Sequence, residues 1–158
     1  MPEYRRLSPD ELHELEKDFI EYLIINGITA EEWEQLKKTD LFKAEKIIDL
    51  FSDVVFESIL RKTSFLEYRD KTKIQIFQCL PEKLVVVVME ALNEDNTDFT
   101  NNEYIAQAAV CPPSSLKVYT TEKKYSRKRE AELFEMLQTG CVITDDKLFK
   151  VLCLSLPH

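Results

Sequence analysis

Residues 73–89 read KIQIFQCLPEKLVVVVM, and this stretch decides the fold. Over residues 73–80 the side chains alternate between two sides, as they do along a β-strand. Residues 84–89 are mostly β-branched, which is typical of a strand that is covered on both faces. Residues 81–83 are short enough to join the two strands as a hairpin. The stretch therefore predicts an antiparallel pair at the centre of a sheet.

Three helical patterns precede this hairpin. The first begins at Ser8, a candidate N-cap within a capping box, and ends at Gly27. The second is short and carries Trp33, whose ring we expect to anchor it against a neighbouring helix. The third covers residues 41–62 behind an Asp40 cap and has a broad apolar stripe.

The chain after the hairpin mixes helix and strand signals. Residues 102–110 predict a short helix, and residues 116–120 predict a third strand. Two C-terminal helices follow, one capped by Ser126 and one capped by Thr144. The whole order predicts a single α+β domain over residues 1–158. We expect it to be mostly helical, with three N-terminal helices, a small antiparallel sheet of two or three strands, and two C-terminal helices.

Composition excludes several classes of enzyme. Gly27 and Gly140 are the only glycines among 158 residues, so a phosphate-binding glycine loop, a dinucleotide fingerprint and a nucleophile elbow are all excluded. The four cysteines include no C-x-x-C pair, and the only histidines are His13 and His158. We therefore expect free thiols, no metal and no cofactor. Without an apolar membrane span or a secretory signal, the protein is expected in the cytoplasm and not at a membrane.

One basic segment stands out in a chain of net charge −8. Residues 114–130 have a net charge of +4, because six basic side chains outnumber Glu122 and Glu130. These six are Lys117, Lys123, Lys124, Arg127, Lys128 and Arg129. They either bind an anion such as phosphate or the RNA backbone, or form a solvated face that pairs with the protein's own acidic helices. The overall negative charge favours the second interpretation and disfavours nucleic acid as a partner.

A row of carboxylates lies on the third predicted helix. Asp49, Asp53 and Glu57 are spaced four residues apart, which places them on one side of the helix. Such a row could hold a divalent cation, but comparable helical metal sites also use histidine. We therefore expect a solvated row that Lys46 and Arg61 neutralise at its ends.

Several short motifs resemble an uncharacterised family of small proteins from the Bacteroidota. They are Tyr4-Arg5-Arg6-Leu7, Gly27-Ile28-Thr29-Ala30 with Trp33, Phe51-Ser52-Asp53, Arg129-Glu130-x-Glu132-Leu133-Phe134-Glu135, and Gly140-Cys141-x-Ile143-x-Asp145-x-x-Leu148-Phe149-Lys150. The resemblance spans nearly the whole chain. It implies one intact domain and no assigned activity. Four residues within these motifs, Arg5, Arg6, Trp33 and Asp53, are our candidates for contact with a partner.

Together these observations predict a non-enzymatic cytoplasmic protein that acts by contact with another, unknown protein. An anion- or RNA-binding protein that uses residues 117–129 is the first alternative. A carboxylate-dependent hydrolase is the second, because two catalytic carboxylates can come from distant segments.

Overall fold

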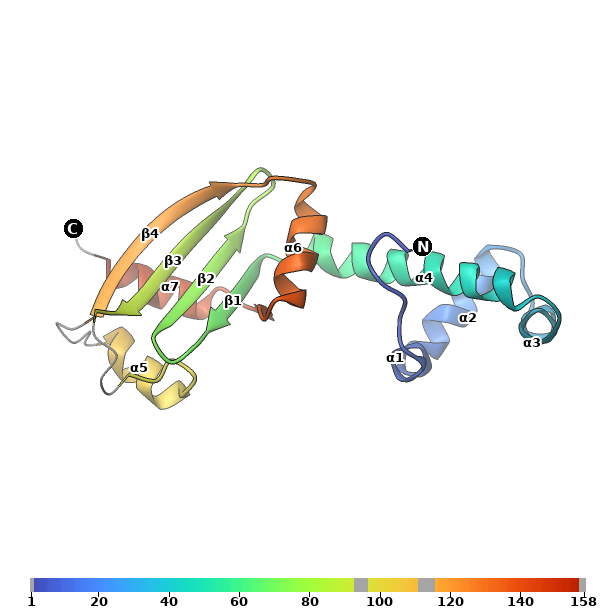
Figure 1. The fold of residues 1–158 in the computed structure, drawn as a ribbon, viewed down its shortest axis with the longest axis horizontal. Coiled ribbons are helices and arrows are strands. Elements are labelled where there is room, and N and C mark those ends of the chain that lie inside the picture. Colours follow the sequence, from blue (N-terminus) through green and yellow to red (C-terminus); the bar gives the residue numbers. More distant parts are fainter. Residues whose placement is uncertain (1, 93–96, 111–115, 157–158) are drawn as a thin grey trace. The chain divides into compact units, whose positions relative to one another are not determined.

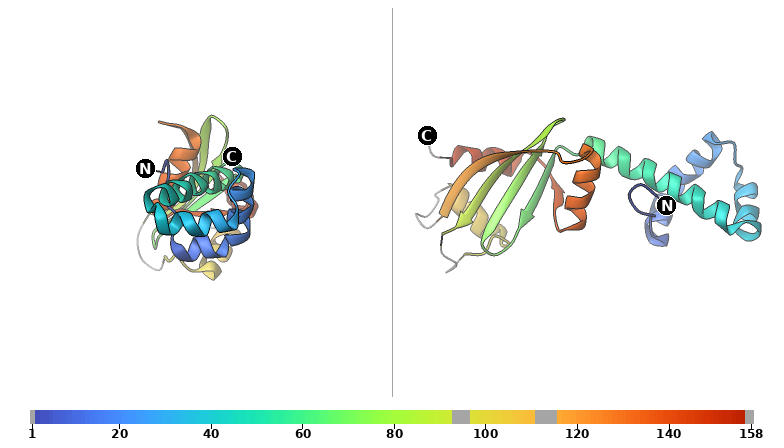
Figure 2. Two further views of the ribbon diagram at one scale, coloured as in Figure 1. Left: turned by 90° about the vertical axis from the view of Figure 1, so that its right-hand side faces the viewer. Right: turned by 45° about the horizontal axis from the view of Figure 1, so that its top comes forward.

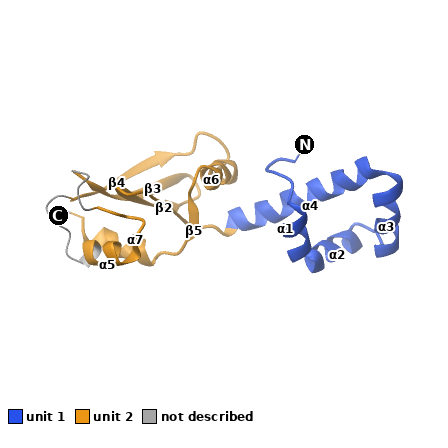
Figure 3. Cartoon of the chain, turned by 60° about the horizontal axis from the view of Figure 1, so that its bottom comes forward, with its two compact units in different colours: residues 1–61 blue, residues 62–158 orange. Residues whose placement is uncertain are grey.

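A computed structural model of the protein describes residues 2–92, 97–110 and 116–156. Two compact units divide the chain, Met1–Arg61 and Lys62–His158 (Figure 3). The first unit is helical, and the second is built on a sheet. The α+β class is thus confirmed, whereas a single domain over residues 1–158 stays a prediction.

The helical unit contains α1 (Pro9–Glu14), α2 (Glu16–Ile25), α3 (Ala30–Thr39) and most of α4 (Leu41–Lys62). Ser8 and Glu11 form the predicted capping box, Thr29 caps α3, and Asp40 accepts a hydrogen bond from the Lys43 amide at the start of α4. The predicted first helix is in fact two, because the chain turns at Leu15. This turn lets Leu12 and Leu15 both pack against the core of the unit.

Aromatic rings form the centre of this helical core. Phe19 of α2 stacks on Phe51 of α4 at 4.9 Å between ring centroids. Trp33 of α3 meets the same Phe19 edge-on at 5.1 Å. Such offset and edge-to-face pairs are the favoured aromatic geometries. The expectation that Trp33 anchors its short helix is therefore confirmed.

Residues 3–7, which we call the N-terminal strap, lie along α4. The amides of Glu3 and Tyr4 donate to the two carboxylate oxygens of Asp53, at 2.9 and 3.1 Å. The Leu7 amide donates to Oγ of the fully buried Ser52 at 2.9 Å, and Ser52 donates in turn to the Ile48 carbonyl. The strap thus joins α4 through hydrogen bonds from its backbone amides to α4 side chains.

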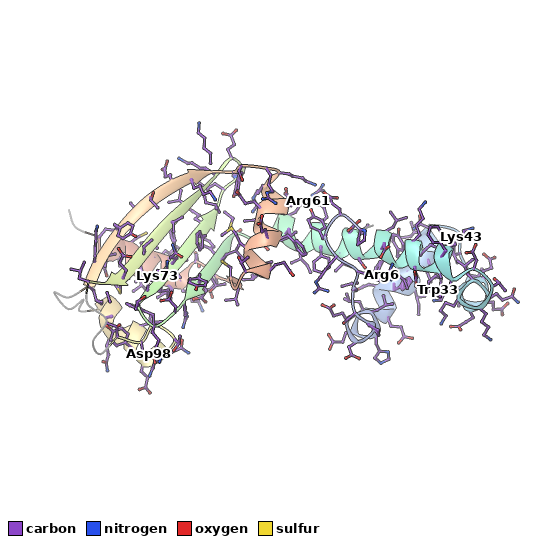
Figure 4. The ribbon with its side chains drawn as sticks, viewed as in Figure 1. Arg6, Trp33, Lys43, Arg61, Lys73 and Asp98 are labelled. Carbon is purple, nitrogen blue, oxygen red and sulfur yellow. The ribbon has the colours of Figure 1, made fainter. Side chains whose placement is uncertain are left out.

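Side chains of the strap complete this attachment. Arg6, marked in Figure 4, pairs with Asp49 at 2.6 Å, and the Tyr4 hydroxyl donates to Glu57. Arg61 also pairs with Glu57, at 3.1 Å. The expectation of a solvated carboxylate row was therefore wrong, but Arg61 neutralises one end of the row as predicted. The strap returns over the row from 43 or more residues away in sequence, a distance that no local pattern reveals.

The second unit holds a five-stranded antiparallel sheet in the order β4-β3-β2-β1-β5. Its elements are β1 (Phe65–Arg69), β2 (Lys73–Cys79), β3 (Lys83–Ala91), α5 (Asn102–Val110), β4 (Leu116–Lys124), α6 (Arg129–Gln138), β5 (Val142–Thr144) and α7 (Lys147–Leu154). The predicted hairpin is present, with Cys79 opposite Leu84 beside the turn. The helix predicted over residues 102–110 is confirmed as α5, whereas its stop at 111–113 lies outside the described residues.

The sequence patterns predicted too few strands for this sheet and the wrong first residue for two helices. β1 and β5 were missed because they have only five and three residues and depend on pairing, β1 with β2 and β5, and β5 with β1. α6 begins at Arg129, since Ser126 bonds to the Glu132 carboxylate instead of capping the helix. α7 begins after Asp146, because Thr144 belongs to β5.

Helices lie on both sides of the sheet. α5 and α7 cover one face, where Ile76, Val87 and Val118 pack with Ile105 of α5 and Leu152 of α7. α6 lies on the other side, at one end of the sheet (Figures 1, 2 and 3). Arg129 ties α6 to this end by donating to the carbonyls of Thr63 and Cys79.

Ser52→Ala should lower the free energy of unfolding of the helical unit by about 1–3 kcal/mol, because the buried Leu7 amide loses its acceptor. Urea unfolding followed by Trp33 fluorescence measures this, since the only tryptophan lies in this unit. Ser58→Ala, on the exposed side of the same helix, is the matched control and should change little. Equal losses in the two variants would contradict the role of the strap.

Stability of the helical unit should fall as the pH drops from about 4.5 towards about 2. The hydrogen bond from Arg5, followed by that from the Ser8 amide, lowers the pKa of Glu11 from 4.5 to about 2. The hydrogen bond from Arg6 lowers the pKa of Asp49 in the same way. Folding lowers these two pKa values. The stabilisation that the two carboxylates provide is therefore complete above pH 4.5 and disappears as the carboxylates of the folded protein take up protons.

Unfolding of Glu11→Gln, measured by Trp33 fluorescence across this pH range, should show a shallower dependence than the parent. Glu21→Gln, exposed on α2, should keep the parent's slope. A Glu11→Gln variant with the parent's slope would show that this carboxylate does not contribute to the pH dependence of stability.

Candidate functional site

An apolar groove of about 530 Å³ lies in the helical unit between α1, α2 and α3. Its lining is mostly aliphatic and aromatic: Pro9, Leu12, His13, Glu16, Phe19, Ile20, Leu23, Ile24, Ile28, Ala30, Trp33, Glu34, Lys37 and Ile48. Figure 4 marks Trp33 among the side chains of this unit. The groove has the size and the apolar character of typical ligand sites in proteins.

Two isoleucines make this groove unusual. Ile20 and Ile24 are one helical turn apart on α2, and they are 43% and 64% exposed. Phe19, Leu23 and Trp33 lie beside them, and these three buried side chains form the bottom of the groove. Single exposed apolar residues are ordinary, but exposed residues that join a preformed apolar hollow mark an interaction site.

Charged side chains surround the groove with an excess of acid. Residues 9–39, which form α1 to α3, carry nine Asp or Glu residues and three Lys residues. At the lining itself, Lys37 pairs with Glu34 at 3.0 Å, and His13 lies 3.9 Å from Glu16. The charges of the lining side chains thus nearly cancel, whereas the acidic excess of the surrounding helices gives the groove a negative electrostatic field.

A second, shallower hollow continues the groove along α2. It is lined by Glu16, Lys17, Ile20 and Glu21 and shares Glu16 and Ile20 with the groove. An elongated ligand would therefore lie along α2, and its edge would contact acidic side chains.

The structure separates the four predicted contact residues. Trp33 lines the groove, whereas Arg5, Arg6 and Asp53 all serve the strap region. Arg5 pairs with Glu11 of the capping box at 2.8 Å and lies over the ring of Phe56. These three residues therefore hold the unit together within itself.

Sequence patterns did not identify Ile20 and Ile24 as functional candidates. Ile20 follows the helical spacing of the first apolar stripe, which predicts that it packs in the core. The width of that stripe is the feature that indicates exposed apolar side chains. Isoleucine also occurs at positions 24 and 25, and one helix cannot bury so wide a stripe on a single side.

The six basic residues of the predicted anion site do not form one patch. Lys117 and Lys123 lie on β4, Lys124 ends it, and all three are exposed. Arg127 pairs with Glu135 at 2.7 Å. Arg129 points inward to the two carbonyls described above, and Lys128 is the N-cap residue of α6.

A carboxylate, a thiol and a phenol are buried or half-buried near α6, and Oε2 of the carboxylate, Glu132, has no hydrogen-bond partner among the described residues. Glu132 accepts from the Ser126 hydroxyl at 2.8 Å and lies 3.6 Å from the Lys123 ammonium. Burial raises the pKa of the Cys79 thiol to about 11 and that of Tyr125, which donates to the Leu80 carbonyl, to about 12. Such a thiol stays protonated at neutral pH and is a poor nucleophile.

Two further properties concern the part of the chain that the structure describes. Within residues 2–92, 97–110 and 116–156, no three histidine, cysteine, aspartate or glutamate side chains gather as a metal site would need. In those same ranges, every helix is too short or too polar to cross a bilayer.

Comparison with known families gives one match. A model described as a family of unknown function, DUF6495, matches residues 1–156. The chain belongs to this family. The match confirms that one family without an assigned function spans the chain, as the motifs implied, whereas an origin in the Bacteroidota stays a prediction. Neither the curated proteins nor the solved structures gave a match.

Arg129→Ala should destabilise this DUF6495 protein by about 2–3 kcal/mol, because two inward-facing carbonyls lose a charged donor. Arg127→Ala, two residues earlier, removes a surface ion pair and should change stability little. Urea unfolding followed by far-UV circular dichroism compares the two. If Arg127→Ala cost as much as Arg129→Ala, the structural role of Arg129 would be refuted.

Proposed function

We propose that this DUF6495 protein is a non-catalytic binding protein whose helical unit holds a segment of a partner protein in its apolar groove. The observation that carries the proposal is the pair of exposed isoleucines, Ile20 and Ile24, beside a base formed by Trp33. Leaving such side chains in water costs free energy that a bound apolar segment would recover.

The occupant we propose is an amphipathic helix with basic flanks. A helix places apolar side chains at intervals of three and four residues, which suits an elongated groove that follows α2. Lysine or arginine beside these anchors would meet the acidic helices around the groove, and the field of residues 9–39 would speed its approach.

A cytoplasmic, non-enzymatic role is part of the same proposal. The scarcity of glycine excludes the common phosphate and nucleotide loops. Cys79, Cys141 and Cys153 are free thiols, which fits a reducing compartment. The carboxylates of α4 give no support to a hydrolase, because Asp49, Asp53 and Glu57 are engaged by the strap and Arg61.

A 15-residue helical peptide of leucine and lysine is the probe for this groove. We expect the full chain to bind it with a change in Trp33 fluorescence, and to bind the leucine–glutamate counterpart at least tenfold more weakly. Ile24→Gln should weaken binding of the leucine–lysine peptide at least tenfold, as loss of an anchor residue does.

Ile25→Gln is the matched control. Ile25 is 82% exposed and adjacent in sequence but does not line the groove, so its replacement should leave the affinity unchanged. Absence of binding by the parent, or equal losses in Ile24→Gln and Ile25→Gln, would refute the groove as the binding site.

A further inference from the structure

The sheet of the second unit has one face that no described helix of the same unit covers across its centre (Figures 1 and 2). Alternation along each strand separates this face from the one that packs on α5 and α7. We call it the open face. Its exposed or partly exposed side chains include Tyr68 of β1, Lys73, Gln75 and Phe77 of β2, Glu90 of β3, Lys117, Tyr119, Thr121 and Lys123 of β4, and Ile143 of β5, beside the buried Val86 and Val88 of β3.

Three aromatic rings stand on the open face. Tyr68, Phe77 and Tyr119 come from three different strands, and each is partly exposed. Strands lie about 4.8 Å apart, so the rings of the two tyrosines are spread over about 14 Å, with Phe77 between them. Gly140, with a φ of +117°, lets the chain pass close to the Tyr68 ring, where an added Cβ would lie 3.4 Å from it.

A lysine accompanies each tyrosine. The ammonium of Lys73 is 5.9 Å from the centre of the Tyr68 ring, and that of Lys117 is 5.0 Å from the centre of the Tyr119 ring. Figure 4 marks Lys73 on the sheet. Lys123 is exposed on the same face, farther along β4. Glu90 lies opposite both Lys73 and Lys117 in the strand register and is the one acidic side chain of the open face as defined.

The charge of the chain is unevenly divided between the units. Residues 1–61 carry 15 acidic and 8 basic side chains, whereas residues 62–158 carry 14 and 13. The negative charge that disfavours a polyanion therefore belongs mainly to the helical unit. The sheet unit is close to neutral, and its open face has more lysine than acid.

We propose that the open face binds single-stranded nucleic acid, with unpaired bases stacked on Tyr68, Phe77 and Tyr119 and phosphates beside the lysines. Stacking on aromatic rings needs a base whose flat side is free, which a duplex does not offer. Stacking also tolerates any base, so the open face binds without sequence preference. This inference concerns the second unit and does not depend on the proposed groove.

The inference revises the anion site predicted from sequence. Lys117 and Lys123 remain, although Lys123 also lies 3.6 Å from Glu132, while Arg127 and Arg129 lie off the open face and are engaged elsewhere in the unit. Lys73 and Tyr68 join them although they lie 44 or more residues earlier in the chain. Their contribution could be seen only after the strands were placed side by side.

Fluorescence polarisation of a labelled 12-nucleotide oligothymidine, titrated with the full chain between 50 and 200 mM salt, tests the proposal. We expect binding at 50 mM salt, and a duplex of the same length should bind at least tenfold more weakly. With three lysines near phosphates, the logarithm of the affinity should fall with the logarithm of the salt concentration with a slope of about −2.

Variants separate stacking from charge. Tyr119→Leu should weaken binding about tenfold or more, as removal of a stacking ring does. Lys117→Gln should make the salt slope shallower by about 0.7. Lys147→Gln, exposed at the start of α7 on the other side of the sheet, is the control and should change neither quantity. Circular dichroism melting checks that each variant is folded.

Several outcomes would overturn the proposal. These are absence of binding at 50 mM salt, equal affinity for the duplex, an unchanged affinity in folded Tyr119→Leu, or a poly-glutamate peptide that binds the same face more tightly. Ile24→Gln should leave oligothymidine binding intact, so failure here and failure of the groove are distinguished.

Discussion

The pairing of β2 with β3 is the interaction on which the sheet unit depends. Seven residue pairs join the two strands, and β3 buries side chains on both faces. On one face Val87 and Met89 meet α5 and α7 through a common core, while Val86 and Val88 form the floor of the other face. β4 pairs with β3 and β1 pairs with β2, which extends the pair on both sides and leaves a broad surface of side chains on the open face.

Long-range hydrogen bonds have a comparable role in the helical unit. The N-terminal strap and α4 meet through Asp49, Ser52 and Asp53, residues that local pattern alone assigns to solvent or to an ordinary helix surface. Two of the family-like motifs, residues 4–7 and 51–53, are therefore the two halves of one attachment. In the sheet unit Arg129 likewise connects α6 to the ends of two other segments.

This explains why the motifs indicate membership of a family but do not indicate a function. Motif residues such as Ser52, Asp53 and Arg129 hold segments together. The side chains on which the two proposed binding surfaces rest, Ile24 and Lys73 among them, lie mostly outside the motifs. The two surfaces also differ in electrostatic character, since acidic helices surround the groove while the open face carries lysines beside its rings.

The sequence by itself determined the features that depend on neighbours a few residues away. Ser8 and Asp40 begin their helices as predicted, Gly27 follows the end of α2 with a φ of +77°, and the β2–β3 hairpin forms where the period changes. Capping, glycine conformations and side-chain periodicity are local, so they can be recognised without the fold.

Only the tertiary structure decided which side chains meet and which remain exposed. The strap over α4, the short strands β1 and β5, and the inward turn of Arg129 all involve partners far away in the chain. Ile24 has the same helical pattern whether or not another segment covers it. Its exposure, like the assembly of Tyr68, Lys73 and Tyr119 on one face, follows from packing and strand register, which the order of residues along one segment does not specify.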